Sequence, residues 1–213
     1  MDASPSTRHL GTDRWMALMG PLFLVLLVVV LALGGNTPAE DATGQKVIDK
    51  LADHGDAVMW AAFSTGPLVA ALLIFVSWLR MSFGSGVGAP RKLMQYGAVV
   101  YAVGLLVNAV VALAEQGAAH DKRADVAEAM NRLASTLWLP VVVGAGLLLL
   151  GAGLSMLRTP GMPSWLGWIG LVVGVISLLG PGGFLGFFVT PIWVAVTGGL
   201  LYFRRADVPD VVV

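Results

Sequence analysis

The sequence predicts an all-α fold: a polytopic membrane protein with six transmembrane helices in a bundle and two short outer amphipathic helices. Two observations predict it. First, 57% of the 213 residues are hydrophobic and 12% are charged, whereas a soluble domain carries roughly 25% charged residues. Second, the apolar residues gather in runs of about 20, the length at which a helix crosses the hydrocarbon core of a bilayer. Membrane lipid is therefore the expected surrounding. The net charge of zero gives no overall attraction to nucleic acid.

Six apolar segments follow one another in a single integral membrane domain, residues 1–213. The first four are long enough to cross alone. The fifth is short and meets the sixth through the tight apolar sequence GPGGFLG, Gly180–Gly186, which predicts a hairpin with little chain outside the membrane. The segments are Trp15–Leu33, Ala57–Leu79, Leu93–Ala114, Ala134–Leu157, Trp165–Gly180 and Phe184–Phe203.

The basic residues predict the orientation. With both tails (residues 1–14 and 204–213) in the cytoplasm, that side holds eight of the 13 Lys and Arg residues but four of the 13 Asp and Glu residues. The outer loops, residues 35–56 and 115–133, hold the others, as the positive-inside rule requires. Arg outnumbers Lys by nine to four, which favours a bacterial source. The predicted location is a bacterial cytoplasmic (inner) membrane.

The first span has a second interpretation as a signal peptide. Arg8 and Arg14 precede it, and Ala32-Leu33-Gly34 has the small residues of a cleavage site. Its apolar core exceeds the usual 7–15 residues of a signal peptide. An uncleaved membrane anchor is therefore the expectation.

Each outer loop has the apolar periodicity of a short helix running into the next span. One pattern places Val47, Ile48 and Leu51 on a single face, and the other places Val126, Met130 and Leu133 on a single face. Two interpretations stay open. Each helix lies in the headgroup zone with its apolar side down, or it caps an outward cavity or docks a partner.

The outer loops also hold the only cluster of metal-ligand residue types. His54 and Asp56 precede the second span, and His120 and Asp121 follow the third. Histidine and carboxylate side chains together bind zinc or a harder divalent ion. The competing interpretation is that Asp53 or Asp56 caps the second span, since Asp at an N-cap accepts free backbone N–H groups. The spacing favours the cap, because metal-binding helices set their ligands three or four residues apart.

No charged residue falls in the middle of a predicted span. Asn108 is the most polar residue at depth, and Ser64 and Thr65 mark a polar step before Pro67. These residues predict either a solute path or a contact between helices, because polar side chains commonly join membrane helices. Glycine is dense in two later spans, and Gly144, Gly146, Gly170 and Gly174 predict close helix packing, within the chain or in a homo-oligomer.

Several functions are excluded by residue types. The chain has no cysteine, which removes disulfides, thiolate zinc sites and iron–sulfur clusters. No lysine for a retinal Schiff base and no histidine pair for haem lies within a span. No catalytic residue and no cofactor is assigned.

One stretch carries a resemblance. The sequence MLRTPGMPSWLGWIGLVVGVISLLG, Met156–Gly180, followed by a Pro-Ile-Trp span that ends in Arg-Arg, resembles an uncharacterised bacterial family of multi-pass membrane proteins, a domain of unknown function. The resemblance covers the C-terminal third. It implies a short inner loop before the last pair of spans, and it implies no activity.

Three classes of function fit these patterns. The leading prediction is a non-enzymatic scaffold or accessory subunit that acts on a protein partner through helix packing and its outer helices. The first alternative is a carrier or channel for a neutral or lipid-like solute, which requires a cavity reaching Asn108 or the Ser64–Thr65 step. The second alternative is a membrane enzyme that uses the outer Asp and His residues.

Overall fold

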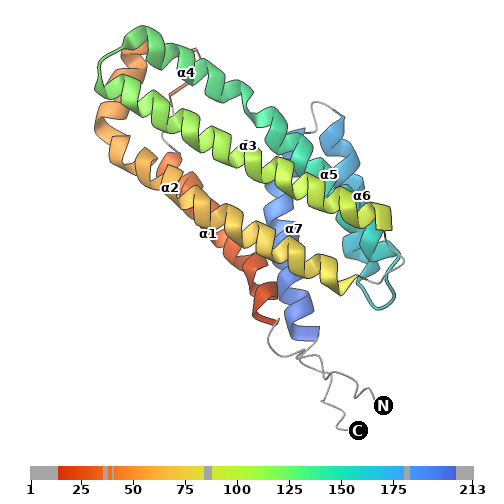
Figure 1. The fold of residues 1–213 in the computed structure, drawn as a ribbon. Coiled ribbons are helices and arrows are strands. Elements are labelled where there is room, and N and C mark those ends of the chain that lie inside the picture. Colours follow the sequence, from red (N-terminus) through yellow and green to blue (C-terminus); the bar gives the residue numbers. More distant parts are fainter. Residues whose placement is uncertain (1–13, 36–37, 40, 84–87, 180–182, 205–213) are drawn as a thin grey trace, which may run out of the picture.

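The computed structural model describes residues 14–35, 38–39, 41–83, 88–179 and 183–204. These residues form a helical bundle that contains no strand (Figure 1). The predicted tails up to residue 13 and from residue 205, and residues 180–182 of the predicted GPGGFLG turn, lie outside the described residues. A short 3-10 helix, Arg14–Leu18, leads into the first of seven α-helices. They are α1 (Met19–Gly34), α2 (Gly44–Ser82), α3 (Gly88–His120), α4 (Ala124–Thr136), α5 (Trp138–Leu157), α6 (Ser164–Leu178) and α7 (Gly183–Arg204).

The predicted all-α fold with several long apolar helices is confirmed for the described residues, whereas the predicted count of six spans and the two separate outer amphipathic helices are not. Five helical stretches are long and apolar enough to cross a membrane: Trp15–Gly34, Gly44–Ser82, Gly88–His120, Ala124–Leu157 and Gly183–Phe203. The predicted fifth span corresponds to α6, which has 15 residues. At 1.5 Å per residue α6 is roughly 22 Å long, shorter than the roughly 30 Å hydrocarbon core.

Helices α2 and α3 are longer than the predicted spans. With 39 and 33 residues they extend roughly 58 and 50 Å, well beyond the core of a bilayer. The pattern predicted as a separate outer helix forms the first turns of α2. Its apolar residues Val47, Ile48 and Leu51 are buried against Ala118 and Ala127 in a small second core. Burial of this face offsets the cost of Gly55 in the helix, about 1 kcal/mol, so α2 continues without a break.

The second outer pattern forms a helix of its own, α4, but it buries another face. Ala127 and Asn131 are buried, whereas Leu133 of the predicted apolar face is exposed. The physical reason is the close approach of α4 to α2. A Cβ atom on Gly44 would overlap the carbonyl of Ala124, so small residues have to form this contact. We call this part of the bundle, where α2 begins and α3 ends, the α4 end (Figure 1).

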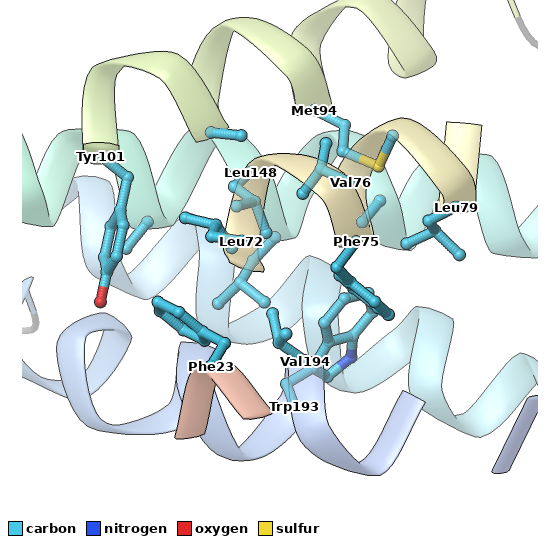
Figure 2. Close-up of a cluster of buried hydrophobic side chains, with 14 of the residues drawn as sticks. Phe23, Leu72, Phe75, Val76, Leu79, Met94, Tyr101, Leu148, Trp193 and Val194 are labelled. Carbon is cyan, nitrogen blue, oxygen red and sulfur yellow. The ribbon is translucent and has the colours of Figure 1, made fainter. Parts of the chain in front are cut away.

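The main core lies in the other half of the bundle. Phe23 of α1, Phe75 of α2 and Tyr101 of α3 meet Val194 of α7 there, and all four are buried (Figure 2). Phe23 and Tyr101 pack edge to face with ring centroids 6.2 Å apart. The main core thus joins helices that are distant in the sequence. The α4 end is packed by the separate second core.

Glycines bring α3, α5 and α6 close together. A Cβ atom on Gly144 would overlap the backbone of Tyr101 on α3. On the other side of α5, a Cβ atom on Gly146 would lie 2.8 Å from the side chain of Leu178, and one on Gly174 would lie 2.7 Å from the backbone nitrogen of Leu150. A Cβ atom on Gly170 would lie 3.1 Å from the Leu149 carbonyl oxygen. All four predicted packing glycines therefore face a neighbouring helix of the same chain.

Candidate functional site

A cavity of about 400 Å³ lies between the helices at the α4 end. Binding sites for small molecules typically measure roughly 300–1,000 Å³. The walls come from the last turns of α1, the middle of α2, the second half of α3 and the end of α4, and Trp138 and Phe187 close it from α5 and α7. The cavity is partly open, and its volume lies within this range.

The wall of the cavity changes in character along the bundle. Leu27, Leu68 and Leu105 line the end nearest the main core, together with Phe187. Trp138 and Phe187 pack edge to face at 4.8 Å between centroids. Toward the α4 end the lining includes carboxyl, amide and hydroxyl groups, contributed by Glu115, Asn131 and Ser135. The cavity is therefore amphipathic, with an apolar floor and a polar end.

Glu115 is the ionisable residue of this cavity. Among the described lining residues there is no other Asp or Glu, and no Lys, Arg or His. Glu115 is 5% exposed, and its Oε1 atom is buried with no hydrogen-bond partner among the described residues. A buried carboxyl group without a partner is costly, which distinguishes this side chain from the solvated acids around it.

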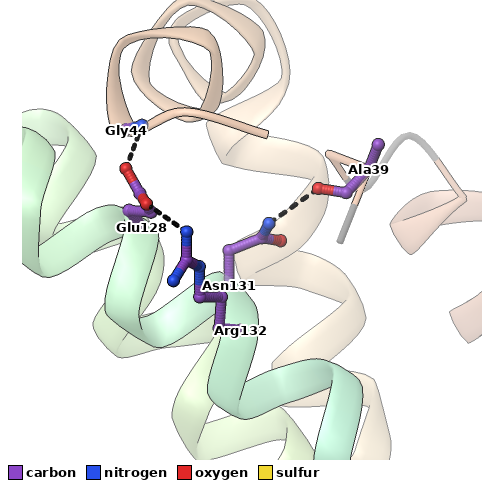
Figure 3. A network of polar contacts seen from close by, with 5 residues as sticks. All are labelled: Ala39, Gly44, Glu128, Asn131 and Arg132. Atoms are coloured by element: carbon purple, nitrogen blue, oxygen red, sulfur yellow. Dashed lines mark hydrogen bonds and ion pairs between the residues drawn. The ribbon is translucent and has the colours of Figure 1, made fainter. Parts of the chain in front are cut away.

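Helix α4 is held over the cavity by polar contacts. Asn131 Nδ2 donates a hydrogen bond of 2.8 Å to the carbonyl of Ala39, and the Gly44 backbone N–H donates one of 3.0 Å to Glu128 Oε2 (Figure 3). Arg132 pairs with the other oxygen of Glu128 at 2.7 Å. Glu128 therefore satisfies a free N–H at the start of α2, the role that sequence patterns assigned to Asp53 or Asp56.

The cap prediction for Asp53 and Asp56 is wrong, because α2 begins at Gly44. Both residues lie inside the helix, on its exposed side. His54, His120 and Asp121 are exposed as well. Across the part of the chain that the structure describes, no group of three or more His, Asp or Glu side chains is placed to hold a metal ion. The predicted cluster of His54, Asp56, His120 and Asp121 thus gains no support.

Asn108 lines the cavity and also makes a contact between helices. Its Nδ2 atom donates to the carbonyl of Gly104 at 3.0 Å and to that of Leu137 at 3.1 Å. The second bond joins α3 to the junction between α4 and α5. Thr65 also lines the cavity, with its hydroxyl donating to Ala61 of its own helix at 3.1 Å. Ser64 is half-buried and is not part of the wall.

Sequence reasoning placed Glu115 in a solvated outer loop and assigned no role to Asn131. The spacing of Asn108, Ala112 and Glu115 contains a signal that was not used. Steps of four and three residues put all three side chains on one helical face, and all three line the cavity. Continuing the predicted third span by one residue, from Ala114 to Glu115, would have placed Glu115 on the same helical face as Asn108.

The fold and the cavity of the described residues together define a class: a helical protein with several helices that are long and apolar enough to span a membrane, and with a ligand-sized, amphipathic cavity between them. Comparison with known proteins adds no name to this class, because no family model, no curated protein and no solved structure matches the chain. The resemblance of the C-terminal third to a bacterial membrane family stays a prediction.

Proposed function

We propose that this protein binds a lipid-like, amphipathic molecule in the cavity at the α4 end, as a membrane binding protein or carrier. The observation that carries the proposal is the cavity itself. It reaches both Asn108 and Thr65, the condition that a solute site had to meet. Its apolar floor suits an alkyl chain, and its polar end suits a headgroup.

The other two classes of function have less support. The glycine faces that favoured a scaffold or homo-oligomer are occupied within the chain. The apolar residues Val47, Ile48 and Leu51, which favoured a docking surface, are buried in the second core. An enzyme would have to use His54 and His120, which are exposed and form part of no metal-binding group among the described residues.

We further infer that the α4 end faces outward from a bacterial cytoplasmic membrane, with α6 and α7 as the fifth and sixth spans. The positive-inside rule supports this orientation. Arg80, Arg91 and Lys92 lie at the other end of α2 and α3. In this orientation the headgroup end of the cavity lies near the outer surface and its floor lies within the hydrocarbon layer.

Filling the cavity tests the proposed function. Ala109 and Ala112 line it, whereas Ala114 lies on the exposed side of the same helix. The double variant Ala109→Leu/Ala112→Leu and the control Ala114→Leu are placed in phosphatidylcholine nanodiscs. Each is then irradiated with a decyl alcohol that carries a diazirine on its chain, and the adduct is measured by intact mass.

We expect saturable labelling of the wild type and of Ala114→Leu, and labelling reduced about tenfold in the double variant, because added methyl groups occupy the space of the chain. Labelling that does not saturate, or that is equal in all three proteins, would refute a binding cavity. Mass analysis of lipids retained after purification in mild detergent would then identify the natural class of ligand.

A further inference from the structure

The carboxyl group of Glu115 bears on which headgroup the cavity binds. It is the one ionisable side chain among the described lining residues, it is almost fully buried, and its Oε1 atom has no hydrogen-bond partner. The neighbouring acid of α4 offers a contrast. Both oxygens of Glu128 have partners within the protein, Gly44 and Arg132, whereas Oε1 of Glu115 has none among the described residues.

We propose that Glu115 selects a ligand with an ammonium headgroup, so that the cavity binds amphipathic amines in preference to neutral or anionic amphiphiles of the same chain length. This inference rests on the proposed function. A carboxylate in an apolar surrounding is stabilised most by an opposite charge that also donates a hydrogen bond. A protonated amine supplies both, whereas an alcohol supplies only the donor.

The walls around Glu115 favour the same choice. No Lys, Arg or His among the described lining residues offers a counter-charge that a ligand cation would have to displace. The Arg132 guanidinium pairs with Glu128, and Arg132 is not among the described lining residues. An anionic headgroup would meet the carboxyl group with no cation to receive it, so anions are disfavoured.

The shape of the cavity places the two parts of such a ligand. Glu115 and Asn131 lie at the polar end, and Leu27 and Leu68 lie at the apolar floor. An alkylammonium ion fits with nitrogen at Glu115 and with its chain along Ala112 and Asn108 toward the leucines. Asn131 is already held by the Ala39 carbonyl, so its role is to position α4, and the charge recognition belongs to Glu115.

Three probes with one chain test the inference: decylamine, decanol and decyl sulfate. At neutral pH the amine is protonated, as a lysine side chain is. Each competes with the diazirine alcohol for wild-type protein in phosphatidylcholine nanodiscs. Glu115→Gln removes the charge at nearly equal size. Asp56→Asn removes an exposed acid of the same end of the bundle and controls for attraction of cations to the surface.

We expect wild type and Asp56→Asn to bind decylamine about tenfold or more tightly than decanol, and to bind decyl sulfate most weakly. In Glu115→Gln the amine should lose this advantage, while decanol affinity stays within about twofold. Equal affinity of wild type for amine and alcohol would overturn the inference without any variant having to fold. An unchanged amine preference in Glu115→Gln would overturn it as well. If none of the three probes competes, the proposed function itself fails.

Discussion

Two glutamates at the α4 end show how position decides the role of a residue. Glu115 lies on α3, and Glu128 lies on the neighbouring helix α4. Glu128 accepts from Gly44 and pairs with Arg132, so it stabilises the start of α2. Glu115 faces the cavity with a buried oxygen that has no partner. A buried carboxyl group without a hydrogen-bond partner is destabilising, and this cost is the reason for proposing that Glu115 recognises a ligand.

The contribution of Asn108 to the stability of the fold can be measured apart from any role in ligand binding. Replacing it by Leu removes the hydrogen bond to Leu137 and leaves that carbonyl at the α4–α5 junction without its donor. We expect Asn108→Leu to lower the free energy of unfolding by about 1 kcal/mol, the size of a hydrogen bond between membrane helices. Unfolding of the purified protein in detergent, followed by circular dichroism, measures the change.

The control for this prediction is Thr65→Val. The Thr65 hydroxyl also lines the cavity, but it bonds to its own helix at Ala61, so its loss should cost less than about 0.5 kcal/mol. A larger loss of stability for Thr65→Val than for Asn108→Leu would contradict the structural role assigned to Asn108.

At the scale of helices, close contacts between backbones hold α3, α5 and α6 together. Gly97 of α3 faces the backbone of Leu148, and Gly144 and Gly151 of α5 face α3 at Tyr101 and Met94. In a membrane, where lipid is as apolar as leucine, such contacts contribute packing that the hydrophobic effect does not supply. These contacts therefore hold α3, which forms one wall of the cavity, against α5.

Gly97→Ala tests this packing. The added methyl group would overlap the Leu148 backbone, so the helices have to separate, and we expect the free energy of unfolding to fall by about 2 kcal/mol. Gly117→Ala is the matched control on the same helix, because nothing lies within 4 Å of its Cβ position. It should be neutral or stabilising by up to about 1 kcal/mol. Thermal unfolding in detergent compares the two, and equal effects would contradict tight packing at Gly97.

The helices could largely be predicted from the sequence, because apolar runs and small-residue faces are local patterns. The predicted spans Trp15–Leu33 and Phe184–Phe203 match the helical stretches Trp15–Gly34 and Gly183–Phe203, and the packing side of Gly144 and Gly174 follows from the same kind of pattern. The continuation of α2 through Gly55 could not be predicted, since it depends on α3 and α4 packing over Val47 and Leu51. The burial of Glu115 depends on the packing of α2, α3 and α4. The cavity could therefore not be predicted from the sequence alone.

For the whole molecule, the distribution of exposed apolar residues fits a membrane. Large apolar side chains are exposed along α1, α6 and α7, among them Val25, Trp168 and Ile192. An apolar surface of this extent is unusual for a soluble monomer and ordinary for helices in contact with lipid. The first turns of α2 and the last turns of α3 extend past that apolar region, with exposed charged residues such as Asp53 and Asp121.

The orientation of the molecule is testable because the chain contains no cysteine. His54→Cys and His120→Cys place a thiol at exposed positions of the α4 end, and Met81→Cys places one at the opposite end of α2. We expect a membrane-impermeant maleimide to label the first two in intact cells and the third only after permeabilisation. The reverse pattern would invert the predicted topology and put the cavity on the cytoplasmic side.

The central claim is that the cavity at the α4 end receives an amphiphile. Ala112→Cys places one thiol on its wall, and Ala114→Cys places one on the exposed side of the same helix. We measure the rate at which a thiol reagent modifies each protein in nanodiscs, with and without saturating decylamine. The predicted result is that decylamine protects Cys at position 112 by about tenfold and leaves position 114 unchanged. Equal rates at position 112 with and without the amine would contradict a ligand in this cavity.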